Sequence, residues 1–122
     1  MSASSANSDA VSLVVADLRA GREPDTAQVR DAVRALLTQL RRRAPGRSVE
    51  VRIPPYGAVQ CVEGPPHKRG TPPNVVEMSP ITFVLLATGH LTWADAARDG
   101  RVTASGTRAD LSPHLPVWVP PA

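Results

Sequence analysis

One long amphipathic segment, residues 25–43, constrains the fold of this chain more than any other. Its apolar side chains recur at helical spacing and are Val29, Val33, Leu36, Leu37 and Leu40. The residues between them are mostly polar or charged, and a Pro-Gly pair at 45–46 ends the pattern. Such a stripe is stable only when a second layer covers it, so the rest of the chain must supply that layer.

Four short segments are predicted to form the second layer as β-strands: residues 48–53, 58–63, 74–78 and 101–105. The first two are joined by a Pro-Pro-Tyr-Gly turn, which indicates a hairpin. Strands combined with helices predict an α+β fold. We expect a twisted, mainly antiparallel sheet of four to five strands, with the helices packed on one face.

The N-terminal part of the chain predicts one further helix. Residues 1–8 are small and polar and are expected to be disordered, which leaves residues 9–122 as a single domain. Residues 9–20 have apolar side chains at helical spacing. Asp9 is the expected N-cap, and Gly21 is the expected stop.

Two short helices are predicted in the C-terminal half from their caps and stops. Ser79 is followed by Pro80, a favoured first helical residue, and Gly89 ends that segment. Thr92 caps the second helix, and Gly100 suits the left-handed position that follows a helix.

Charge and composition exclude several classes of protein. A balance of 14 basic and 11 acidic residues gives a net charge of +3, which is too mild to indicate nucleic-acid binding. One cysteine rules out an internal disulfide and fits a reducing compartment, so the cytoplasm is the expected location. We find no apolar run of about 18 residues and no secretory signal at the N-terminus.

No motif in the sequence predicts catalysis, so the chain is not expected to be an enzyme or to use a cofactor. His67, His90 and His114 have none of the spacings typical of metal ligands. Cys61 with a remote histidine could form a reactive thiolate pair. Because Cys61 lies on the apolar face of a predicted strand, a buried structural thiol is the favoured interpretation.

The loop between the second and third predicted strands is the best polar candidate. It carries His67, Lys68 and Arg69, followed by Gly70 and Thr71. Flexible backbone beside these cations could bind an anion, and an anion-dependent enzyme would use the same loop. The alternative is an ordinary solvated connection, which is the more common role of a charged loop.

Three consecutive arginines, Arg41, Arg42 and Arg43, fall in the last turn of the long helix. There they complement the helix dipole, which is the favoured interpretation. The alternative is a patch for phosphate or lipid headgroups, consistent with a transient contact at a membrane surface.

The predicted elements direct one set of apolar residues toward a single layer: Val49, Val51, Ile53, Val59, Cys61, Val75, Phe83, Leu86, Leu91 and Val102. A filled hydrophobic core and a lined ligand cavity both require this pattern. Periodicity does not separate the two, and both interpretations stay open.

The C-terminal half resembles sterol-carrier-like lipid-binding domains. The resemblance rests on a Gly-x-Leu-Thr-x-x-x-Ala segment and a Gly-x-Val-x-x-x-Gly segment, formed by Gly89, Leu91, Thr92, Ala96, Gly100, Val102 and Gly106. The stretches PPYGAVQCVEG, GTPPNVVEM and GTRADL are most similar to the small actinobacterial branch, the sterol carrier family proteins. The similarity covers roughly residues 49–115.

This resemblance implies non-catalytic binding or transfer of a lipid or another apolar small molecule, held between the sheet and the helices. The residues expected to line that space are Val51, Ile53, Val59, Val75, Phe83, Leu86, Leu91, Trp93 and Val102. An interaction or regulatory module that keeps the fold without a cavity is the alternative. No nucleic-acid partner is expected, and the sequence predicts no particular oligomeric state.

Overall fold

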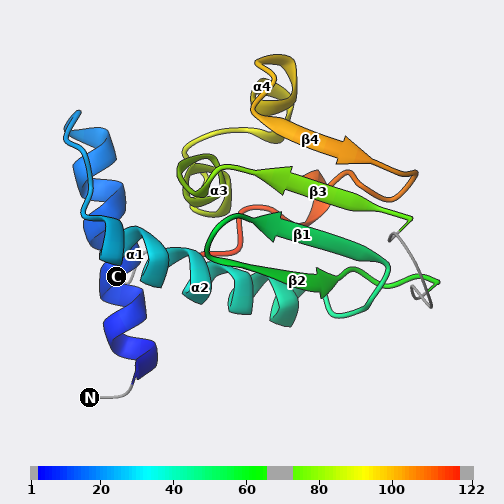
Figure 1. The fold of residues 1–122 in the computed structure, drawn as a ribbon, viewed down its shortest axis with the longest axis horizontal. Coiled ribbons are helices and arrows are strands. Elements are labelled where there is room, and N and C mark those ends of the chain that lie inside the picture. Colours follow the sequence, from blue (N-terminus) through cyan, green and yellow to red (C-terminus); the bar gives the residue numbers. More distant parts are fainter. Residues whose placement is uncertain (1–2, 66–72, 119–122) are drawn as a thin grey trace.

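The computed structural model describes residues 3–65 and 73–118, and in these residues four α-helices pack with one mixed four-stranded sheet (Figure 1). The elements in chain order are α1 (Ala3–Arg19), α2 (Thr26–Arg43), β1 (Val49–Ile53), β2 (Gly57–Cys61), β3 (Val75–Met78), α3 (Pro80–Ala87), α4 (Trp93–Arg98), β4 (Val102–Ser105) and a short 3-10 helix η1 (Ser112–His114). The predicted α+β class is confirmed.

The strands lie in the order β2-β1-β3-β4. β1 and β2 form the predicted hairpin, in which Val51 pairs with Val59, and β3 pairs antiparallel with β4. The central pair, β1 and β3, is parallel. The sheet is therefore mainly antiparallel but mixed, because the chain returns from the β2 edge to the opposite side of β1.

Helix α2 lies against the sheet, α1 and α3 pack against α2, and α4 contacts β4. Every predicted stripe residue of α2 is buried, and α2 packs against α1, α3 and β2. On β1, Val49, Val51 and Ile53 are buried, whereas Glu50 and Arg52 are half-buried and form an ion pair with each other. This alternation shows that the apolar face of the sheet meets the helices and the polar face does not.

The predicted orientation of β3 is wrong by one residue. Val76 and Met78 are buried, whereas Val75 is only half-buried, on the other face of the strand. Asn74 takes an inward position, where both the nitrogen and the oxygen of its side-chain amide form a hydrogen bond. Its amide nitrogen donates to the Ser48 carbonyl at 2.8 Å, and its oxygen accepts from the backbone N–H of Arg108 at 3.0 Å. Alternation along the strand then turns Val75 outward.

Asn74 also explains why position 106, the last position of the Gly-x-Val-x-x-x-Gly segment, is a glycine. Gly106 has a φ of +104°, and a Cβ at this position would collide with the Pro73 carbonyl oxygen and with Oδ1 of Asn74. Any other residue would therefore have to displace the strand connection as well as adopt a strained backbone.

The predicted caps of the two C-terminal helices are confirmed. Oγ of Ser79 accepts from the backbone N–H of Thr82 at 3.2 Å, and Oγ1 of Thr92 accepts from that of Asp95 at 3.1 Å. Gly100 has a φ of +71° after α4. These local signals fix where α3 and α4 begin and where α4 ends.

Helix α1 begins earlier than predicted. It starts at Ala3, so Asp9 lies inside the helix and is not its N-cap, and the segment 1–8 expected to be disordered overlaps the helix from Ala3 onward. Gly21, with a φ of +72°, follows its end as predicted. Figure 1 shows α1 crossing α2 at one end of the molecule.

Candidate functional site

The residues predicted to line a lipid cavity fall into three groups. Val51, Ile53, Phe83 and Leu86 are buried in the central core. Val59, Leu91, Trp93 and Val102 are half-buried at its margins, and Val75 lies on the outer face of β3. Val51, Ile53 and Phe83 line none of the four best-defined pockets on the described part of the chain.

One pocket does bring predicted residues together. We call it the α4 pocket. It has a volume of about 350 Å³ and is lined by Leu86, Gly89, Leu91, Thr92, Trp93, Ala94, Ser112, Leu115 and Pro116. Leu86, Leu91 and Trp93 were predicted from the sequence, and none of the described lining residues carries a charge. The pocket lies at the edge of the core, between the end of α3, the start of α4 and the C-terminal tail.

Hydrogen bonds hold the three walls of the α4 pocket in place. The backbone N–H groups of Val117 and Trp118 both donate to the Ala87 carbonyl, at 2.9 and 3.1 Å, which fixes the tail beside α3. The N–H of Leu91 donates to the Leu85 carbonyl at 3.2 Å. The Thr92 cap then sets the first turn of α4, which carries Trp93 and Ala94.

Sequence reasoning missed the wall that the tail contributes. Leu115 and Pro116 follow η1 in a segment without helical or strand periodicity, so no pattern marks them as lining residues. The only signal was the apolar character of the tail itself, in which Val117 is buried and Trp118 is half-buried.

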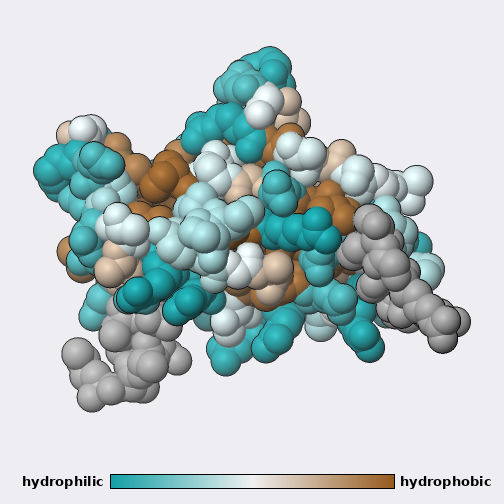
Figure 2. Space-filling view, viewed as in Figure 1, coloured by the Kyte–Doolittle hydropathy of each residue, from teal (hydrophilic) through white to brown (hydrophobic). Residues whose placement is uncertain are grey.

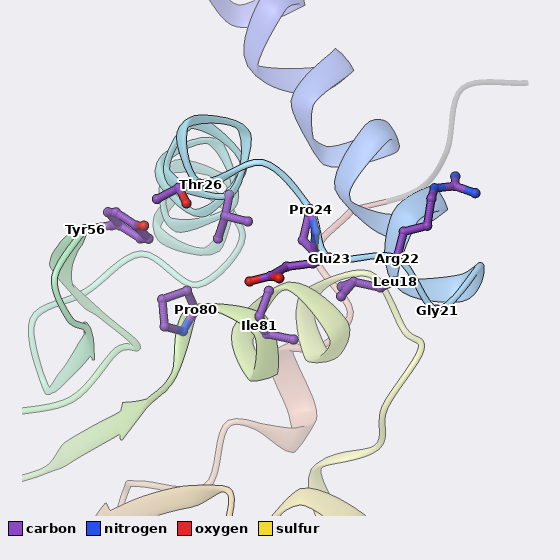
Figure 3. Close-up of a pocket in the computed structure, with 10 residues that line it drawn as sticks. Leu18, Gly21, Arg22, Glu23, Pro24, Thr26, Tyr56, Pro80 and Ile81 are labelled. Carbon is purple, nitrogen blue, oxygen red and sulfur yellow. The ribbon is translucent and has the colours of Figure 1, made fainter.

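A second and larger pocket was not predicted at all. We call it the α1–α2 pocket. Its volume is about 510 Å³, and it is lined by Leu18, Gly21, Arg22, Glu23, Pro24, Thr26, Val29, Tyr56, Pro80 and Ile81 (Figure 3). These residues come from the end of α1, the α1–α2 connection, the start of α2, the β1–β2 turn and the start of α3. Figure 2 shows hydrophobic surface between α1 and α3, in the same region.

Cys61 is buried, as predicted, with none of its surface exposed. Burial raises the pKa of its thiol from 9.0 to about 11, because the apolar surroundings disfavour the charged thiolate. The thiol is therefore protonated at neutral pH, which opposes a role as a nucleophile.

The predicted anion-binding residues His67, Lys68, Arg69, Gly70 and Thr71 lie outside the described residues. Within residues 3–65 and 73–118, no group of three or more His, Cys, Asp or Glu side chains is arranged to hold a metal ion. In the same part of the chain, no helix combines the length and the apolar character needed to cross a membrane.

Comparison with known families gives a match that covers most of the chain. The model of a family described as bacterial SCP ortholog, where SCP stands for sterol carrier protein, matches residues 25–117. The matched region begins at the N-cap of α2 and ends in the C-terminal tail, so it contains the whole sheet and every residue of the α4 pocket. Among curated proteins, none matches the chain.

Proposed function

Because the chain belongs to the family of bacterial sterol carrier protein orthologs, we propose that it binds a lipid or another apolar small molecule in the α4 pocket without catalysing a reaction. One observation carries the choice of site. The α4 pocket is walled by Leu86, Leu91, Trp93 and Leu115, and all of its described lining residues are uncharged and lie inside the matched region.

The size of the α4 pocket favours a single acyl chain or a partly inserted ligand. Its volume of about 350 Å³ is near the lower end of the range for small-molecule sites, ~300–1,000 Å³. Burial of about ten methylene groups would contribute ~8 kcal/mol, which corresponds to a Kd of about 1 µM before the cost of association. We therefore expect micromolar or weaker affinity.

The test of this proposal uses two alanines of α4. Ala94 and Ala97 are both exposed, but only Ala94 lines the α4 pocket. Ala94→Arg should weaken the binding of a twelve-carbon alcohol at least about tenfold, because a charged side chain enters an uncharged space. Ala97→Arg adds the same charge elsewhere on the helix and should leave the affinity unchanged.

Ligand entry can be followed through the indole of Trp93, which lines the α4 pocket, whereas Trp118 does not. A shift of the emission that is lost in Ala94→Arg and kept in Ala97→Arg supports the proposed site. Wild-type protein that binds no acyl chain would instead favour the alternative, an interaction module that keeps the fold without a ligand.

The cellular setting follows as part of the same proposal. A free buried thiol at Cys61 fits a reducing compartment, which supports the cytoplasm. Arg41, Arg42 and Arg43 are exposed at the end of α2 and could support a transient contact with an anionic membrane during ligand pick-up. Vesicles with and without anionic lipid would test this contact, since only the anionic vesicles should bind.

A further inference from the structure

The α1–α2 pocket combines apolar walls with a polar rim. Leu18, Val29, Tyr56, Pro80 and Ile81 supply most of the apolar surface. Its charged lining residues are Arg22 and Glu23, adjacent in the connection between the two helices. The directions of these two side chains and their ion-pair partners determine which class of ligand the pocket accepts.

The Arg22 side chain already forms an ion pair with Asp17. Its Nε lies 3.0 Å from Oδ1 of Asp17, and its backbone N–H donates to the Asp17 carbonyl at 2.8 Å. In Figure 3 the Arg22 side chain points away from the other side chains that line the pocket. Its positive charge is therefore balanced by Asp17 and directed out of the pocket.

The Glu23 side chain, in contrast to that of Arg22, points toward the pocket. In Figure 3 its carboxylate extends from the connection toward the pocket, beside Ile81 and Pro24. Among the residues whose side chains the structure describes, none forms a hydrogen bond or an ion pair with the Glu23 carboxylate. Arg22, Asp17 and Glu23 together leave one net negative charge at the rim of an apolar pocket.

From this arrangement we infer that the α1–α2 pocket is a second ligand site, specific for an amphiphile with a cationic head such as a long-chain amine or quaternary ammonium. The alkyl chain contacts Leu18, Val29 and Ile81, and the cation lies beside the Glu23 carboxylate. An alkyl carboxylate of the same length places like charges together and binds more weakly.

This inference goes beyond the function proposed for the α4 pocket. Half of the lining residues, Leu18, Gly21, Arg22, Glu23 and Pro24, precede the region that the family model matches. The site therefore depends on α1 and the α1–α2 connection of this chain. A negative binding result at one pocket therefore does not count against the proposal for the other.

The experiment compares decyltrimethylammonium with decanoate by titration calorimetry, both below their micelle concentrations. Amide shifts of Gly21 and Ile81 in NMR spectra assign the binding to this pocket. We expect the cation to bind about tenfold more tightly than decanoate. Glu23→Gln should remove most of the preference, and Glu23→Lys should reverse it. Glu63→Gln, which removes an exposed negative charge outside the α1–α2 pocket, should change nothing.

Each outcome decides one part of the inference. Equal affinities for the two amphiphiles in wild type would overturn the cation preference. Shifts at Leu91 and Trp93 with none at Gly21 and Ile81 would overturn the second site and leave the α4 pocket as proposed. A preference that persists in Glu23→Gln would show that the carboxylate is not its source.

Discussion

The two apolar pockets of this protein differ in their rims more than in their walls. Among the residues whose side chains the structure describes, the α4 pocket has aliphatic and indole walls without a charged residue. The α1–α2 pocket has comparable walls, and the Glu23 carboxylate extends toward it without a partner among those same residues. Apolar walls supply affinity that scales with buried area and discriminates poorly between chains. We therefore expect the rims to set selectivity, so that the α4 pocket accepts neutral chains and the α1–α2 pocket accepts cations.

The two pockets also differ in how they are assembled. The α4 pocket is built mostly from one stretch, residues 86–94, with the tail as its outer wall. The α1–α2 pocket needs α1, α2, the β1–β2 turn and α3 to meet. A change that loosens helix packing should therefore affect the α1–α2 pocket first.

The largest expected effect is at Leu36, which is fully buried in α2. Leu36→Asp places an unpaired charge in the core and should lower the free energy of unfolding by at least about 3 kcal/mol in a urea titration, with loss of both pockets. Thr38→Asp, on the exposed side of the same helix, should cost much less. A near wild-type midpoint for Leu36→Asp would contradict the packing of α2.

The separation of the two pockets is tested by crossing their variants. Ala94→Arg should weaken the neutral alkyl ligand about tenfold without changing the affinity for the cationic one. Glu23→Lys should do the reverse. A double variant should show the sum of the two effects, because the sites share no lining residue. Coupling greater than about 1 kcal/mol would mean that the two pockets form one site.

A smaller effect is expected at the floor of the α4 pocket. Leu86 is 1% exposed and borders both the core and the pocket. Leu86→Trp should extend into the pocket, weaken alkyl binding and cost less than about 1 kcal/mol of stability in a denaturant titration. In a filled core the same change would overpack and cost about 1–3 kcal/mol.

The smallest effect is expected at Cys61, which lines neither pocket. Cys61→Ala should change both affinities by less than about twofold. Rapid reaction of the native thiol with a labelling reagent at neutral pH would contradict its burial.

The raised pKa of Cys61 also has a consequence for stability. Since folding favours the protonated thiol, this contribution is full below about pH 9 and is lost as the pH rises toward about 11. The free energy of unfolding of Cys61→Ala should therefore fall less steeply over this interval than that of wild type. Parallel curves for the two proteins would contradict the assignment.

Local backbone signals made much of the fold predictable. Ser79 and Thr92 cap helices because their side-chain oxygens accept bonds from N–H groups three residues ahead, and Gly100 follows α4 because its φ is positive. The stripe on α2 and the alternation on β1 are equally local. Each of these features depends on neighbours in the sequence, so the sequence by itself determined the element types, the α+β class and the family motif.

The errors arose where distant segments decide the local structure. Alternation alone did not show whether Val75 or Val76 turns inward on β3. The choice depends on Asn74, whose partners Ser48 and Arg108 lie 26 and 34 residues away in the chain. The start of α1 at Ala3 was missed because residues 1–8 are small and polar, a composition that favours disorder.

The residues that line the pockets show the same limit of prediction from local sequence patterns. The sequence identified Leu86 and Leu91 as apolar residues on an inner face, but spacing is the same for a residue that fills a core and one that borders a space. Only the tertiary structure brought Leu115 and Leu91 to the same pocket and Glu23 beside Ile81, because a pocket is the volume left between segments that no local pattern relates.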